Sequence, residues 1–398
     1  MRGNGLRTIA RLCEQANDTP QGGINSADAV SCDRLQAKGF TLVITGGGTG
    51  GHIFPGIAVA QAVMTKMPSA RVIFIGTDRA VDQNAMSRYG FASRVVPCGI
   101  LKGGSIAAKL KTMARLPWSL FRAWRVLREI KPDLVLGVGG YVTGPVVLAA
   151  KLSGIATCIH EQNSVPGLAN RKLGAIVDRV FVSIPGSERY FDAKRCRLTG
   201  NPLRHEILSM SQQQSEACGP ILLVLGGSQG AHRLNTLLPQ ALTGNDALPK
   251  GFKVIHQTGR ADETAVRTAY LAAGIEAEVA AFFTDMAGVY TKASLVVSRA
   301  GATTLAELTA LGKPSILVPF PFAADDHQRK NAEALVAGGA ARMLLEEGLS
   351  AKSLGQEIVR VMTDQGLRQQ MSQAAKRLAK PEAVATIMAE CLELAGAK

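Results

Sequence analysis

A glycine-rich stretch at residues 45–56, TGGGTGGHIFPG, contains the first residues whose types could support chemistry. An apolar, β-branched run at 40–44 precedes it, and a helical pattern extends from Pro55 to about residue 67. A glycine turn between a strand and a helix gathers backbone N–H groups that bind anionic oxygen. His52 lies on this turn, where its imidazole can titrate near neutral pH and meet a substrate. The stretch therefore predicts an anion-binding turn beside a candidate acid or base.

The same glycines permit a second interpretation. Gly46, Gly48 and Gly51 fit the dinucleotide-binding spacing GxGxxG, and Asp78 follows a second predicted strand. That interpretation predicts an oxidoreductase that binds NAD through Asp78. A lone GxGxxG is weak evidence, and the remaining motifs favour a different function.

Two further stretches in the first half of the chain place glycines or polar side chains where a predicted strand ends. Residues 137–145, GVGGYVTGP, form a second glycine turn, which could hold another phosphate or could only allow close packing. Residues 160–163, HEQN, follow a buried strand, and four adjacent polar residues there are typical of a site. Within them, Glu161 is a second candidate acid or base.

Two stretches in the second half open predicted helices. In SRAGATTLAE, residues 298–307, small residues at 301–303 leave the helix start open to a diphosphate. Glu307 follows one turn later, where its carboxylate can accept both hydroxyls of a ribose or can only favour the helix dipole. Residues 325–332, DDHQRKNA, begin another helix and fit either a site or a solvated helix start.

These motifs lie within a regular alternation of strands and helices, which predicts parallel sheets covered on both faces. The pattern restarts at residue 221, where GGSQGAH at 226–232 weakly repeats the opening turn. We therefore expect an α/β protein with two doubly wound, Rossmann-like domains facing a cleft. The expected parts are an extension at 1–38, a first domain at 39–202, a second at 203–380, and a C-terminal helix at 381–398 that packs back on the first. The expected strands are 40–45, 71–76, 94–97, 133–137, 156–160, 179–183, 221–225, 253–257, 278–281, 294–298, 314–318 and 340–344.

Composition limits the function further. The chain has 398 residues and a formal net charge of +14, which favours phosphates, nucleic acid or an anionic membrane as partners. Aromatic residues make up only 5%, and no nucleic-acid-binding motif is present, so we expect no nucleic acid partner. The seven cysteines are scattered without metal-ligand spacing and read as reduced and structural. Residues 1–38 lack an apolar core for a signal peptide, and we expect a disordered extension.

A basic, amphipathic segment at 99–131 carries both tryptophans of the chain, Trp118 and Trp124, and a single acidic residue, Glu129. Such a segment suits docking on an anionic membrane face. The alternative is an ordinary helix with both tryptophans in the core.

Seven motifs occur together: GGTGGHIFPG, GVGGYVTGP, HEQN, GNPLR, GGSQG, SRAGATTLAE and DHQRKNA. Their order and spacing resemble the MurG-type glycosyltransferases of family 28, from about residue 40 nearly to the C-terminus. The resemblance implies a GT-B fold and an inverting transfer of N-acetylglucosamine from UDP-GlcNAc to the C4 hydroxyl of the muramoyl sugar of lipid I, which forms lipid II. It implies a peripheral place on the cytoplasmic face of the inner membrane, with other cell-wall synthesis proteins as candidate partners. HEQN and GGYVTGP together disfavour a UDP-sugar epimerase or a lipid galactosyltransferase.

The resemblance also assigns roles to residues of this chain. Glu307 matches the residue that binds the ribose, and Phe283 matches an apolar position that contacts uracil through its backbone. The remaining donor-binding or phosphate-binding matches are Thr49, Gly50, Gly51, Asn163, Arg204, Ser228, Ala302, Thr303, Thr304, Leu305, Ala306 and Gln328. The turns at 46–51 and 137–144 are available for the acceptor diphosphate, through Gly48, Gly139, Gly140 and Tyr141.

An inverting transfer needs a base for the incoming hydroxyl. His52 suits this role by residue type, and Glu161 is the alternative. Helix N-termini at 301–303 and 228–230, with Arg204, can stabilise the departing UDP. The sequence has no DxD motif and no clustered carboxylates between its strands, so we expect no metal and no cofactor.

Overall fold

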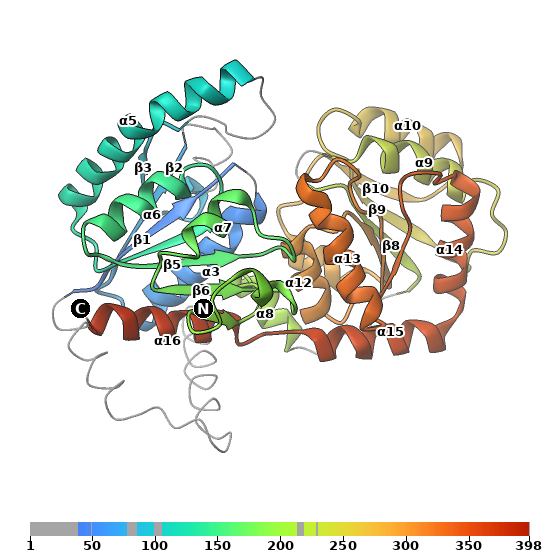
Figure 1. The fold of residues 1–398 in the computed structure, drawn as a ribbon. Coiled ribbons are helices and arrows are strands. Elements are labelled where there is room, and N and C mark those ends of the chain that lie inside the picture. Colours follow the sequence, from blue (N-terminus) through green and yellow to red (C-terminus); the bar gives the residue numbers. More distant parts are fainter. Residues whose placement is uncertain are drawn as a thin grey trace.

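The computed structural model describes residues 39–48, 50–77, 86–98, 106–212, 219–227 and 230–397, with side chains of the 106–130 helix described from residue 116. Two separate sheets stand beside each other, each flanked by helices (Figure 1). We call residues 39–198 with the last helix the N-terminal lobe, and residues 221–378 the C-terminal lobe.

The sheet of the N-terminal lobe has seven strands in the order β3-β2-β1-β4-β5-β6-β7. Every neighbouring pair is parallel. Its strands are β1 (Thr41–Gly46), β2 (Arg71–Gly76), β3 (Ala92–Val95), β4 (Leu134–Gly139), β5 (Ala156–Glu161), β6 (Arg179–Val182) and β7 (Cys196–Leu198). Its helices are α3 (Gly50–Lys66), α5 (Ile106–Ile130), α6 (Thr143–Leu152), α7 (Leu168–Leu173) and the short η1 (Ser187–Tyr190).

The sheet of the C-terminal lobe has six parallel strands in the order β10-β9-β8-β11-β12-β13. They are β8 (Ile221–Leu225), β9 (Lys253–Gln257), β10 (Ala277–Ala280), β11 (Leu295–Ser298), β12 (Ser315–Leu317) and β13 (Ala341–Met343). The helices of this half are α8 (His205–Ser211), α9 (His232–Leu242), α10 (Glu263–Ala272), α11 (Met286–Lys292), α12 (Ala302–Ala310), η2 (Ala324–Asp326), α13 (His327–Ala337), α14 (Ala351–Thr363) and α15 (Gln365–Leu378).

The central strands of each sheet are apolar because both faces of the sheet are covered there, whereas the edge strand β3 is exposed. In the N-terminal lobe, one core layer joins the sheet to α3 and to the last helix, and a second joins it to α5 and α6. In the C-terminal lobe, α12, α13 and α15 cover one face, while α9 and α14 cover the other.

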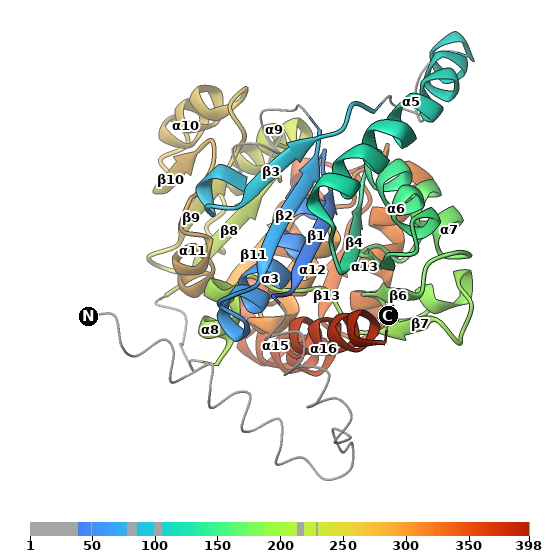
Figure 2. The ribbon, with the colours of Figure 1, turned by 90° about the vertical axis from the view of Figure 1, so that its left-hand side faces the viewer.

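The last helix, α16 (Ala383–Gly396), returns to the N-terminal lobe. Its Ile387 and Cys391 are buried in the same core layer as α3. Glu390 anchors it through an ion pair with Arg179, with 2.7 Å between the charged atoms. Helices α15 and α16 follow each other beneath the two sheets, one under each lobe (Figure 1), and both lie below the strands in the perpendicular view (Figure 2).

The predicted α/β class and the pair of parallel sheets are confirmed, and the expected strands differ from the observed ones by at most two residues at an end. The three-residue strand β7 was not predicted. Helix α3 begins at Gly50 rather than at Pro55, so His52 lies in its first turn and not on the preceding loop. Pro55 is tolerated inside α3 although it has no N–H to give to the carbonyl of Gly51.

Helix α5 is the longest helix described and carries Pro117. Within the described residues, no helix is both long and apolar enough to span a membrane.

Candidate active site at the junction of the two lobes

The two glycine turns of the N-terminal lobe pack directly on each other. The N–H of Gly47 donates to the carbonyl of Gly139 at 3.2 Å. A Cβ atom on Gly140 would lie 2.4 Å from the carbonyl oxygen of Gly47, and Gly48 and Gly140 both have positive φ. Glycine is therefore required in these turns by close approach and by backbone conformation. The predicted phosphate turns are adjacent, with Tyr141 exposed beside them.

Thr143 holds the two turns together, although the sequence did not single it out. Its buried hydroxyl lies 2.8 Å from the carbonyl of Gly139 and 3.1 Å from that of Thr45. A threonine at the start of a helix is too common for its partners to be predicted without the fold.

His52 is fixed between the second glycine turn and the HEQN segment. A Cβ atom on Gly139 would lie 2.7 Å from His52 Nδ1, so the ring rests on that glycine. His52 Nδ1 lies 3.1 Å from Oε1 of Gln162, which is buried. The amide nitrogen of Gln162 donates to the carbonyl of Val138 at 2.8 Å and lies 3.0 Å from His160 Nδ1.

His160 is buried beneath this contact. Its Nε2 lies 3.2 Å from the carbonyl of Gly200, in the segment that leads to the C-terminal lobe. Burial lowers the pKa of His160 to about 4, and the hydrogen bond to Gly200 only partly opposes that effect. His160 is therefore a neutral imidazole near pH 7.

Glu161 is also buried, and both of its carboxylate oxygens already accept hydrogen bonds. Oε1 accepts from the backbone N–H and the side-chain amide of Asn163, at 2.9 and 3.2 Å. Oε2 accepts from the N–H of Gly167 at 3.1 Å and from the amide of Asn170 at 3.0 Å. This geometry suits a carboxylate that shapes the loop after β5, and it disfavours the alternative of Glu161 as base.

The N-termini of α3 and α12 meet where the lobes join. The hydroxyl of Thr303 donates to the carbonyl of Gly51 at 3.2 Å, and the amide of Asn201 lies 3.5 Å from the same hydroxyl. Gly51 has this carbonyl available because Pro55 provides no N–H four residues later. No side chain caps the N-terminus of α12, so its backbone N–H groups can face a ligand.

The α12 residues carried over from the resemblance divide into two groups. Ala302 and Leu305 have buried side chains in the hydrophobic core, so they can contact a ligand only through the backbone. Thr303, Thr304 and Ala306 are half-buried; Thr303 contacts the facing helix α3, and Ala306 packs against the core. Gly50 and Gly51 contribute the facing helix turn.

Glu307 is 5% exposed and joins three elements. Its two oxygens accept from Arg204 Nη2 at 2.8 Å and from the Tyr290 hydroxyl at 2.9 Å. Burial and the Glu307 carboxylate raise the pKa of Tyr290 well above its usual value, so its phenol remains a donor. Burial opposes the charge on Arg204, but the same carboxylate outweighs this effect and raises the Arg204 pKa. The Arg204 guanidinium also lies over the ring of Phe54, 4.6 Å from its centre, and so links the lobes.

Asn331 is a junction residue that the sequence did not single out. Its fully buried amide donates to Asn163 Oδ1 and to the carbonyl of Ala300, both at 3.2 Å. Its oxygen accepts from the N–H and the hydroxyl of Ser164, at 2.8 and 2.9 Å. Asn163 is thereby held from both lobes.

The two remaining donor-site predictions, Gln328 and Phe283, each take part in a hydrogen bond between a backbone N–H and a side-chain oxygen. Gln328, at the start of α13, accepts the N–H of Phe320 at 3.0 Å. Phe283 has its side chain in the core, and its N–H donates to Oε1 of Gln257 at 3.1 Å. Thr49, Ser228 and Asp78 lie outside the described residues. Within the described residues, no group of three or more His, Cys, Asp or Glu side chains could hold a metal ion.

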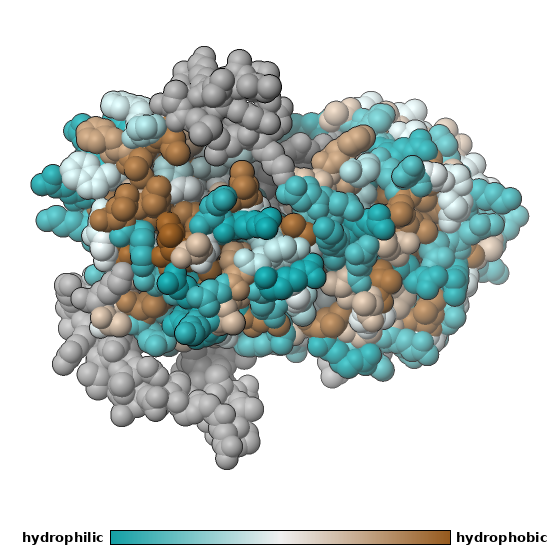
Figure 3. All heavy atoms as spheres, in the orientation of Figure 1, coloured by the Kyte–Doolittle hydropathy of each residue, from teal (hydrophilic) through white to brown (hydrophobic). Residues whose placement is uncertain are grey.

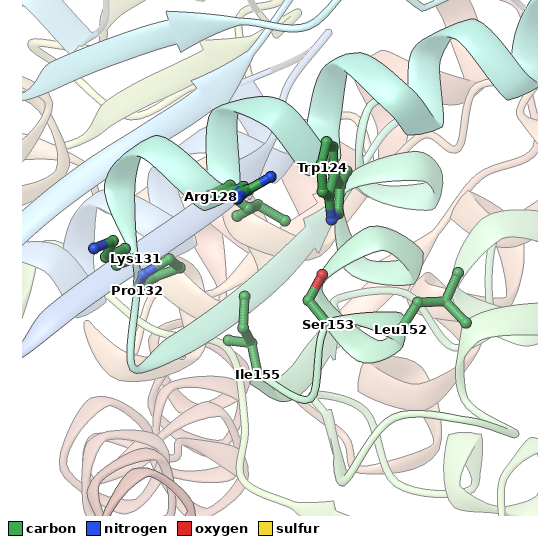
Figure 4. Close-up of a pocket in the computed structure, with 8 residues that line it drawn as sticks. Trp124, Arg128, Lys131, Pro132, Leu152, Ser153 and Ile155 are labelled. Atoms are coloured by element: carbon green, nitrogen blue, oxygen red, sulfur yellow. The ribbon is translucent and has the colours of Figure 1, made fainter.

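A separate feature lies on the outer face of the N-terminal lobe. Trp118, Phe121 and Trp124 of α5 are 57%, 49% and 39% exposed, and neighbouring ring centres are 5.9 Å apart. The alternative with both tryptophans in the core is therefore wrong. Beneath α5, a pocket of about 610 Å³ is lined by Trp124, Arg128, Leu152 and their neighbours (Figure 4). Hydrophobic residues gather on this side of the molecule, over α5 and α6 (Figure 3).

Comparisons with known proteins agree with this arrangement. Residues 42–182 match the glycosyltransferase family 28 N-terminal domain, and residues 221–387 match the family 28 C-terminal domain. A protein of Desulfotalea psychrophila is 49% identical over 89% of this chain and 96% of its own length, and one of Geobacter sp. (strain M21) is 43% identical over 87% and 94%. Both are named UDP-N-acetylglucosamine--N-acetylmuramyl-(pentapeptide) pyrophosphoryl-undecaprenol N-acetylglucosamine transferase.

A crystal structure of Acinetobacter baumannii MurG superimposes with a TM-score of 0.71 at 30% identity, covering 89% of this chain and 99% of that one. Its similarity spans both lobes and the junction between them. The chain therefore belongs to glycosyltransferase family 28, with the GT-B fold.

Proposed function

We propose that this chain transfers N-acetylglucosamine from UDP-GlcNAc to the C4 hydroxyl of the muramoyl sugar of lipid I and so forms lipid II. Relatives that match nearly the whole chain are named for this transfer. The observation that carries the proposal is the meeting of two helix N-termini, with His52 on one side of the contact and Glu307 on the other. Such a junction suits a diphosphate-bearing donor and a diphosphate-bearing acceptor.

The donor occupies the C-terminal lobe in this proposal. The open N-terminus of α12 binds the UDP diphosphate, since its N–H groups and dipole favour anions. Glu307 accepts the ribose hydroxyls with the lone pairs that Arg204 and Tyr290 leave, and the carbonyl of Phe283 faces the uracil. Asn163 and Gln328 approach the sugar. The acceptor diphosphate lies at the glycine turns of the N-terminal lobe.

The chemistry is a single displacement with inversion. His52 takes the proton of the C4 hydroxyl while that oxygen forms a bond to C1 of the donor sugar. The bond from C1 to the diphosphate oxygen breaks on the opposite face, and its electron pair leaves with UDP. The α12 N–H groups and Arg204 stabilise the charge that develops on the diphosphate. Glu161 keeps the loop after β5 in shape, and the reaction uses no metal.

The exposed aromatic side chains of α5 dock on the anionic, cytoplasmic face of the inner membrane, where the lipid-linked acceptor is found. Trp118, Phe121 and Trp124 suit the interfacial region, and Arg122, Arg125 and Arg128 lie on the same helix. We keep 202/203 and 380/381 as the proposed domain boundaries, and other cell-wall synthesis proteins remain proposed partners.

The test is transfer of labelled N-acetylglucosamine to a lipid I analogue with a chelator present. Glu307→Gln keeps an acceptor for Tyr290 and removes the charge beside Arg204, so we expect the KM for UDP-GlcNAc to rise about tenfold, as hydrogen bonds to charged groups contribute about 1.5–3 kcal/mol. Glu347→Ala changes an exposed carboxylate away from the junction and should leave transfer unchanged. Absence of product from the folded wild type would refute the proposed reaction, and activity that requires a divalent ion would refute the metal-free mechanism.

A further inference from the structure

We infer that Gln162 is a positioning residue, which keeps the proton of neutral His52 on Nδ1 and leaves Nε2 as the basic nitrogen. The inference rests on the proposed function for its consequence, because His52 is the base in that reaction. The evidence for the inference is the direction of four hydrogen bonds near the junction, which join Gln162 to Val138, His52 and His160, and His160 to Gly200.

The orientation of the Gln162 amide is fixed by Val138. A backbone carbonyl can only accept, so the group 2.8 Å from the Val138 oxygen must be the NH₂ of Gln162. The amide oxygen then faces His52 Nδ1 at 3.1 Å. An amide oxygen also only accepts, and Nδ1 of His52 must therefore carry the hydrogen.

His160 confirms this orientation from the other side. The second hydrogen of the Gln162 NH₂ points to His160 Nδ1 at 3.0 Å, which must be unprotonated to accept it. The proton of His160 is then on Nε2, where the carbonyl of Gly200 at 3.2 Å accepts it and the hydroxyl oxygen of Ser183 lies 3.0 Å away. A protonated His160 would place an N–H against the amide NH₂, and burial disfavours that charged form.

The ring of His52 has little freedom to exchange its two nitrogens. Gly139 supports the ring from below, since a Cβ atom there would lie 2.7 Å from Nδ1 and 2.9 Å from Cε1. A ring flip would remove the acceptor from the protonated nitrogen and leave the buried Gln162 oxygen without a donor, which costs about 1–3 kcal/mol. Gln162 thus acts on His52 without touching the substrate.

The position of the hydrogen on His52 determines the path of the proton during the reaction. Nε2 takes the proton of the acceptor hydroxyl as that oxygen binds C1 and UDP departs, and His52 becomes an imidazolium with hydrogens on both nitrogens. Gln162 has no basic group for the Nδ1 proton. The same proton that entered at Nε2 must therefore leave from Nε2 to solvent before the next turnover.

The first test is nitrogen NMR of the full chain labelled in its histidine rings, with a His52→Asn sample to identify one of the six histidines. We expect neutral His52 to show a protonated Nδ1 and an unprotonated Nε2. The opposite pattern would overturn the inference, whatever the enzyme transfers. Absence of transfer with the expected pattern would instead refute the proposed function alone.

The second test is kinetic. Gln162→Met keeps the length of the side chain and removes the acceptor, so we expect kcat to fall about 10- to 100-fold, which is part of the 10²–10⁴-fold that a general base contributes. The KM for UDP-GlcNAc should change by less than about twofold, because the donor site is intact. Gln61→Met makes the same replacement at a half-buried glutamine of α3 and should retain wild-type kcat. A wild-type kcat for Gln162→Met, or His52 still protonated only on Nδ1 in that variant, would refute the positioning role.

Discussion

The hydrogen bonds of Asn331 between the two lobes allow a quantitative prediction of how a substitution there changes donor binding. Its side chain reaches from α13 to the loop after β5 and makes three hydrogen bonds to that loop, two with Ser164 and one with Asn163. A fourth stays within the C-terminal lobe, to the carbonyl of Ala300. Replacing Asn331 by alanine removes all four bonds. In an arrangement with the lobes open, Asn163 and Ser164 can hydrogen-bond to water instead, so the substitution destabilises the closed arrangement relative to the open one.

The difference between the closed and open arrangements determines how much the substitution should weaken donor binding. At about 1 kcal/mol for each net hydrogen bond, the closed arrangement loses about 3 kcal/mol relative to an open one. If the donor binds only the closed arrangement, its affinity falls by up to about 100-fold. The carbonyl of Ala300 stays buried without this partner, so the free energy of unfolding falls by about 1–3 kcal/mol.

The assay compares the KM for UDP-GlcNAc and urea unfolding for three variants. Asn331→Ala should raise the KM between about 10- and 100-fold, and Ser164→Ala, which removes one of the three bonds, about fivefold. Lys330→Ala changes the exposed neighbour on the same helix and should match the wild type. A wild-type KM for Asn331→Ala, with the expected loss of stability, would show that these bonds do not hold the lobes for the donor.

Three other predictions concern the base, the core and the membrane face. Gly139→Ala places a methyl group against the ring of His52 at positive φ, and kcat should fall at least tenfold while circular dichroism keeps the native spectrum; an unchanged kcat would contradict the packing. Because burial lowers the pKa of His160 to about 4 from 6.5, the unfolded chain binds its proton first, so urea midpoints should be constant above about pH 6.5 and fall from there toward pH 4; equal midpoints at pH 6.5 and 4.5 would refute the assignment. Trp118→Ser should weaken binding to anionic vesicles, and added salt should weaken it further, whereas equal binding to neutral vesicles would exclude an electrostatic contribution.

The sequence predicted what local rules determine. Strands, glycine turns and helix starts follow from side-chain pattern and backbone freedom, so the ends of β1, β4 and β5 were placed correctly to within two residues. The Rossmann-like order then requires these ends to share one edge of the sheet. Residues of the turns and of HEQN could therefore be predicted as neighbours from the order of the strands alone.

Partners across long sequence separations could not be predicted in this way. HEQN indicated a site, but the direction of each of its side chains depends on contacts with Val138, Gly200 and Asn331. Glu161 is a candidate base by residue type, and the four donors around its oxygens, which support the structural role that we propose for it, could not be predicted from the sequence. Residue type thus limits the candidates for the base, while the number of buried hydrogen-bond partners favours one candidate over the other.

Pro55 shows how a local sequence rule and a contact between distant residues act together. By local rules, a proline in the sixth position of α3 is a defect, because it leaves the carbonyl of Gly51 without its helical donor. In the folded chain that carbonyl accepts the hydroxyl of Thr303 from the other lobe. A carbonyl within an ordinary helix is already paired and would offer this contact only weakly. The missing N–H of Pro55 therefore gives the first turn of α3 a free acceptor at the junction, next to the imidazole that we propose as the base.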